Sequence, residues 1–103
     1  MNANSNTNSN ELIDALRRLI EIAHGNTGQC QYVSNFLLAW WNAGSCGGFD
    51  FTDMWAVDDK IAMDMLKVVL LIAKRNNYPD AYGFRADFEQ LVAKWRPHLL
   101  RGE

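Results

Sequence analysis

The sequence predicts an all-α protein, a compact bundle of about four helices with a long irregular connection between the second and third helices. Three observations lead to this fold class. Apolar residues recur every three or four positions in four separate stretches. Residues that cap or break helices lie between those stretches. The 103 residues are the length of one domain, and a 49% apolar content is enough for a core without disulfides.

The first predicted helix has Asn10 as its N-cap and ends at Gly25. Before it, residues 1–9 are rich in Asn, Ser and Thr and bury too little to offset the entropy of ordering them. We therefore expect a disordered tail over 1–9 and a single helical domain over 10–100. The apolar stripe of this helix comprises Leu12, Leu16, Leu19, Ile20 and Ala23.

The second predicted helix covers about Gln29 to Asn42 and is apolar almost all round its cylinder. Such a helix is either central in the fold or partly covered by a partner. The glycine-rich segment 44–48 should follow it as a flexible loop that exposes Cys46. The widest apolar face is made of Tyr32, Val33, Phe36, Leu37, Trp40 and Trp41.

The third predicted helix runs from about Asp59 to Arg75, and Asp58 or Asp59 is a suitable cap. Met65 and Val68 fall on its main apolar face, whereas Leu71 falls among lysines on the polar side. An apolar residue in that position suggests contact with a partner.

The fourth predicted helix runs from about Phe84 to Arg96 and is ended by Pro97. Residues 76–80, which contain a Tyr-Pro pair, separate it from the third helix.

Charge and composition argue against several classes of partner. The net charge of −2, without a basic patch, predicts no direct contact with nucleic acid. The longest apolar run, residues 68–73, is far shorter than the ~20 residues of a membrane span. The first ten residues do not resemble a signal peptide, so we expect a cytoplasmic protein whose cysteines are free thiols.

The possible ligands and nucleophiles do not form a recognised motif. Cys30 and Cys46 are isolated, and the two histidines lie near opposite ends of the chain, so zinc spacing is missing. The acids between 50 and 59 do not follow the spacing of a calcium loop and suit helix caps better. The sequence thus predicts no metal, no cofactor and no catalytic residue. It does not decide whether the protein is an enzyme, but it favours a protein that is not one.

The stretch "WWNAGSCGGFDFTDMW", residues 40–55, is the richest in aromatic side chains. Its aromatic residues either all pack in the core, or some pack in the core while others form an exposed interface for a partner. Both interpretations stay open. The aromatics at 49, 51 and 55 are expected to hold the segment against the bundle. The candidate interaction surface comprises Trp40, Trp41, Phe49, Asp50, Phe51, Asp53, Trp55 and Leu71.

Two longer stretches, "YVSNFLLAWWNAGSCGGFDFTDMWAVDDKIAMDML" and "YPDAYGFRADFEQLVAKWRPHL", resemble a family of small uncharacterised proteobacterial proteins. These proteins are carried on plasmids and integrative conjugative elements, and the likeness covers about Tyr32 to Leu99. The resemblance implies a bacterial cytoplasm and a mobile-element setting, and it brings no activity or site residues with it.

The favoured function is that of a non-enzymatic accessory factor that binds another protein, whose identity the sequence leaves open, with a homodimer as one form. One alternative is a small enzyme or ligand-binding module with a site in the 44–55 loop. Such a site would be lined by Cys46, Asp50, Asp53 and Trp55. Another alternative is a regulator that acts through a protein partner.

Overall fold

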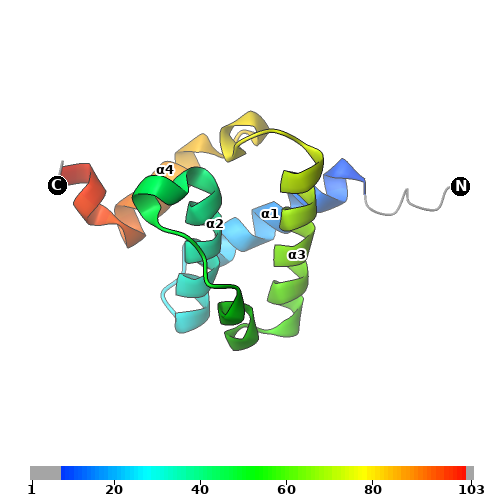
Figure 1. Ribbon diagram of the computed structural model, residues 1–103, viewed down its shortest axis with the longest axis horizontal. Coiled ribbons are helices and arrows are strands. Elements are labelled where there is room, and N and C mark those ends of the chain that lie inside the picture. The colour runs from blue at the N-terminus through cyan, green and yellow to red at the C-terminus, as the bar shows by residue number, and fades with distance from the viewer. Residues whose placement is uncertain (1–7, 102–103) are drawn as a thin grey trace, which may run out of the picture.

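A computed structural model of the chain describes residues 8–101 (Figure 1). Within that range it contains four long helices, three 3-10 segments and no strand, which confirms the predicted all-α bundle. The connection between the second and third helices is the longest irregular part, as expected. The helices are α1 (Ser9–Ala23), α2 (Gly28–Cys46), α3 (Asp59–Lys74) and α4 (Arg85–Trp95). The 3-10 segments are η2 (Phe51–Ala56), η3 (Pro79–Tyr82) and η4 (Pro97–Arg101).

Helix α1 is the centre of the bundle. It packs against both α3 and α2, while α4 packs against α2 on the other side (Figure 1). The apolar stripe predicted for α1 is entirely buried. None of the helices within residues 8–101 is long and apolar enough to cross a membrane.

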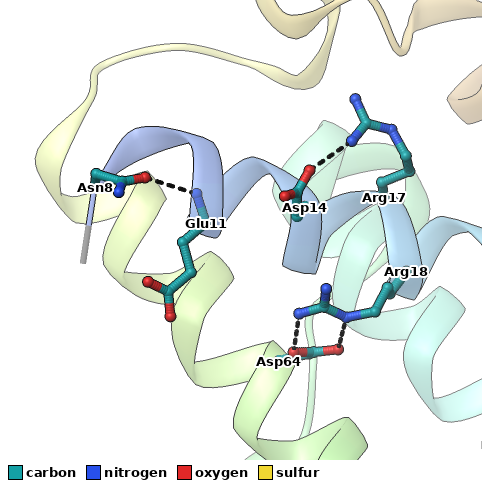
Figure 2. Close-up of polar contacts among 6 residues, drawn as sticks. All are labelled: Asn8, Glu11, Asp14, Arg17, Arg18 and Asp64. Carbon is teal, nitrogen blue, oxygen red and sulfur yellow. Dashed lines mark hydrogen bonds and ion pairs between the residues drawn. The ribbon is translucent and has the colours of Figure 1, made fainter. Parts of the chain in front are cut away.

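Helix α1 begins earlier than the sequence suggested. Asn8 is its N-cap, and the Oδ1 atom of Asn8 accepts a hydrogen bond of 3.0 Å from the backbone N–H of Glu11 (Figure 2). The choice of Asn10 as cap was therefore wrong, because an equivalent side chain two residues earlier reaches the free N–H groups of the first turn. The described part of the chain thus includes Asn8 and Ser9 of the predicted tail, and the rest of that tail, residues 1–7, lies outside the described residues.

The carbonyl oxygen of Ala23, at the end of α1, joins three helices. The Nε1 atom of Trp95 in α4 donates to it over 2.9 Å. The hydroxyl of Ser34 in α2 lies 3.2 Å from the same oxygen and 2.8 Å from the carbonyl oxygen of Cys30. Gly25 then lets α2 approach closely, because a Cβ atom there would lie 2.6 Å from the Sγ atom of Cys30.

Polar contacts also join α1 to α3. The guanidinium of Arg18 donates two hydrogen bonds, each 2.8 Å long, to the two carboxylate oxygens of Asp64 (Figure 2). This hydrogen bonding raises the pKa of Arg18. Arg17 pairs with Asp14 within α1 over 2.7 Å, as its spacing predicts.

The rotation of α3 about its own axis corrects one prediction. Met65 and Val68 are buried as expected, but Leu71 is also in the core, with only 1% of its surface exposed. Leu71 follows Asp64 by seven residues, so both lie on the face that Arg18 of α1 contacts. Leu71 therefore does not belong to an exposed interaction surface.

We predict that Leu71→Ala lowers the free energy of unfolding by about 2–5 kcal/mol, because it leaves a cavity between α1 and α3. The adjacent Leu70 is the matched control, since it is 36% exposed on the same helix. Leu70→Ala should cost less than about 1 kcal/mol. Urea denaturation of the two variants measures both values, and similar losses would contradict this orientation of α3.

Candidate functional site

Three adjoining hollows form a groove along the exposed side of α2. Their volumes are about 650, 300 and 280 Å³. All three are lined by Ala39 and Trp40, so together they make one continuous surface. We call this surface the aromatic groove. It comprises Phe36, Ala39, Trp40, Trp41, Phe49, Phe51, Ile72, Tyr78 and Asp80, together with Asn42, Ala43, Gly44, Arg75, Asn76 and Asn77.

The two adjacent tryptophans of α2 form the wall of the groove. Trp40 and Trp41 are both half-buried, and both pack against Phe88 of α4. Their ring centroids lie 6.2 Å and 5.4 Å from that of Phe88. Each tryptophan therefore has one part of its ring in the core and another part at the surface, where it is held rigidly.

Helical geometry in α2 breaks just after these tryptophans. Asn42 has φ −166° and ψ 86°, and its Oδ1 atom accepts from the backbone N–H of Ser45 over 3.1 Å. Asn42 thus ends the main helix, as predicted, and caps one further turn that reaches Cys46. The expected loop over 44–48 is consequently shorter, and the chain turns at Gly47, whose φ is 97°.

The connection after α2 carries aromatic side chains in three different situations. Phe49 packs edge-on against Phe36, with centroids 5.3 Å apart, and so holds the connection to α2. Phe51 packs edge-on against Phe49 at 6.1 Å, yet 73% of its surface is exposed. Trp55 is 85% exposed, so the expectation that it holds the segment against the bundle was wrong. Both exposed aromatics belong to η2, in which no residue is buried.

The acids of this segment mainly organise its backbone. Asp50 caps η2: its Oδ1 atom accepts from the backbone N–H of Thr52 at 2.9 Å and from the Thr52 hydroxyl at 2.7 Å. These bonds lower the pKa of Asp50. Asp53 lies in the first turn of η2, half-exposed. Asp58 is the N-cap residue of α3, but its side chain makes no capping bond and instead contacts Gln29.

Cys46 is not in an exposed loop, contrary to expectation. Only 6% of its surface is accessible, because the last turn of α2 folds back against α4. The Nε atom of Arg96 donates to the carbonyl oxygen of Cys46 over 2.9 Å, and its Nη2 atom donates to Asn35 over 2.7 Å. Burial raises the pKa of the Cys46 thiol, and the positive charge of Arg96 opposes this rise only in part. The thiol therefore stays protonated at neutral pH.

The site proposed for a small enzyme is not assembled. Cys46 lines none of the three hollows, and neither do Asp50, Asp53 or Trp55. Over residues 8–101, no three side chains of His, Cys, Asp or Glu are grouped so that they could hold a metal ion. What the structure does assemble is a groove lined by both aromatic and polar residues, with exposed aromatic side chains beside it.

Sequence reasoning missed the far wall of the groove. Ile72, at the end of α3, and Tyr78, in the segment that follows it, lie against Ala39 and Trp40. The signal present in the sequence was an aromatic residue, Tyr78, in a segment that breaks the helix before a proline. Spacing along the chain cannot show that residues nearly forty positions apart meet.

We predict that both cysteines react slowly with a thiol reagent at neutral pH in the folded protein, since both are buried. The raised pKa keeps Cys46 in its unreactive thiol form until the pH exceeds the ordinary value for a cysteine. Above that pH the unfolded thiol ionises first, so this group lowers stability as pH increases. Mass spectrometry of labelling over time measures the rate, with urea-unfolded protein as control. Fast labelling of Cys46 in folded protein near pH 7 would contradict its burial.

One comparison with known proteins places the chain in a family. Neither a curated protein nor a solved structure matches the chain. The model of one family, described as a family of unknown function (DUF7673), matches residues 13–96. These residues run from the second turn of α1 to the residue after α4, so they include both walls of the aromatic groove. Because the match covers most of the sequence, the chain belongs to the DUF7673 family.

Proposed function

We propose that the protein is a non-enzymatic accessory factor that binds another protein through the aromatic groove and η2. The observation that carries this proposal is the exposure of Phe51 and Trp55 in one short segment beside the groove. Large aromatic side chains are usually covered in a lone soluble domain. At protein interfaces, tryptophan is among the residues that contribute most to binding.

The construction of the groove supports recognition of a protein segment. Trp40 and Trp41 are held against Phe88, and Phe49 is held against Phe36, so the walls are ordered before a partner arrives. A preformed surface loses little side-chain entropy on binding. The open, elongated form of the groove suits an extended or helical segment with apolar side chains.

The charges beside the exposed aromatics indicate the chemistry of that segment. Asp50 and Asp53 flank Phe51, and the lowered pKa of Asp50 keeps it ionised well below neutral pH. A lysine or arginine of the partner could pair with these carboxylates and lie over the ring of Trp55. We therefore infer a partner segment that combines apolar anchors with basic residues.

The setting of the proposal is a bacterial mobile element. This part rests on the resemblance of residues 32–99 to proteins carried on plasmids and conjugative elements. A regulator that acts through its partner remains compatible with the same groove. A catalytic role has less support, because Cys46 is buried and does not face the groove.

We predict that Trp55→Ala weakens partner binding by about 30-fold or more, the loss typical of a central tryptophan at an interface. Phe51→Ala should weaken it less, because Phe49 still covers part of the groove. Both variants should unfold at the same urea concentration as the wild type, since these side chains are exposed.

The measurement begins with affinity capture from a bacterial host, followed by calorimetry with the purified partner. Leu100→Ala is the matched control, because Leu100 is 64% exposed on η4, which lines none of the three hollows. A partner that binds wild type and Leu100→Ala but not Trp55→Ala supports the proposal. Binding of every captured protein to Trp55→Ala with wild-type affinity would contradict it.

A further inference from the structure

A second apolar surface lies on the outer side of α3. Met63, Leu66 and Leu70 are 55%, 50% and 36% exposed, and Val69 beside them is also exposed. Met63, Leu66, Leu70 and Ala73 follow one another at spacings of three, four and three residues, which is the pattern of a helix–helix seam. We call Met63, Leu66, Leu70 and Ala73 the outer stripe.

The outer stripe is separate from the surfaces already described. Helix α1 covers the opposite side of α3, where Met65, Val68 and Leu71 are buried. The aromatic groove meets α3 at Ile72 and Arg75, which lie on the side turned toward α2. The outer stripe can therefore be covered while the groove stays open.

We propose that the outer stripe binds the outer stripe of a second copy of this chain, with the two α3 helices antiparallel. A two-fold axis relates the copies, so each contact occurs twice, as in most homodimers. Leu66 then lies opposite Leu70 of the second copy, and Met63 lies opposite Ala73. Leucine packs on leucine at the centre of the seam, and Met63 packs on the small side chain of Ala73 at each end, which allows close packing.

Charge complementarity selects this orientation. Asp58 and Asp59 are at the N-terminal end of α3, and Lys74 and Arg75 are at its C-terminal end. Antiparallel packing brings Asp59 within reach of Lys74 of the second copy at both ends of the seam. Parallel packing would instead bring acids against acids and align the two helix dipoles unfavourably.

The charged groups near the stripe favour this pairing at its ends and oppose it along one edge. Within residues 8–101, neither Asp59 nor Lys74 has an ion pair, so both are free to bind across the seam. On one edge, Lys60 approaches Lys74 of the second copy and Lys67 approaches its own counterpart, and these like charges weaken the pairing. The charge of Lys67 is offset by Glu11, whose carboxylate lies 3.4 Å away. Attractive and repulsive charge contacts partly cancel, and a single helix face buries only a small area. We therefore expect a weak dimer.

The dimer adds a property that the proposed function lacks. Two grooves in one particle bind a partner with repeated or paired segments more tightly than one groove does, without any new contact. The proposal does not depend on the identity of that partner. It can be tested on the purified protein alone.

Sedimentation of the full chain from about 1 μM to about 1 mM should show a reversible monomer–dimer equilibrium. Leu66→Lys places new like charges at the centre of the seam and should raise the dissociation constant at least about tenfold. Leu100→Lys is the matched control, because η4 lies at the far left of Figure 1 and α3 at the right. A monomer at every concentration, or a dimer that Leu66→Lys does not weaken, overturns the proposal and leaves the stripe to a different partner.

Orientation is tested by charge exchange. Asp59→Lys and Lys74→Asp should each weaken the dimer about two- to tenfold. The double variant should recover much of this loss, because the opposite charges again meet across the seam. Circular dichroism of each variant verifies that the helices are intact. Single variants that leave the dimer unchanged, or a double variant weaker than both, overturn the antiparallel arrangement.

Mixed disulfides give an independent test of the same arrangement. Met63→Cys and Ala73→Cys proteins, mixed and oxidised, should form a cross-linked heterodimer, whereas each alone should form little. The native cysteines are buried and do not interfere. Efficient cross-linking of Met63→Cys with itself would instead indicate parallel helices and overturn the proposal.

Discussion

The bidentate contact between Arg18 and Asp64 is the constraint on which the arrangement of surfaces depends. Helix α3 buries Met65, Val68 and Leu71 on the side turned toward α1. A partly exposed ion pair contributes little to total stability. The bidentate contact nevertheless requires one orientation, because it forms only when the Asp64 side of α3 is turned toward Arg18. With Asp64 turned toward α1, Leu71 enters the core and the outer stripe faces solvent.

A second set of contacts holds the groove. The carbonyl oxygen of Ala23 accepts from Trp95, which ties α4 to the end of α1. Arg96, the next residue, holds the last turn of α2 through the carbonyl oxygen of Cys46. Between these two anchors, Phe88 supports both tryptophans of the groove wall. The groove is rigid because neighbouring helices fix each side of it.

These constraints support the proposed role in recognition over a catalytic one. The thiol that could have been a nucleophile is buried, and burial raises its pKa. The side chains that reach solvent in the 49–55 segment are aromatic rings, which supply contact area, and carboxylates with no exposed thiol beside them. Asp50 is occupied in capping η2. The proposed groove and the proposed dimer seam use different faces, so one fold can carry both.

The sequence by itself determined which segments are helical and nearly where they end. Local spacing of apolar residues and local breakers decide these features, so α3 and α4 begin and end within one residue of expectation. It also marked residues 40–55 as the stretch richest in aromatic side chains, without deciding which of them are exposed. Only the tertiary structure decided which face of α3 is buried, that Cys46 is covered, and that Tyr78 completes the groove. Each of these depends on a neighbour distant along the chain, and a periodic pattern carries no information about which neighbour that is.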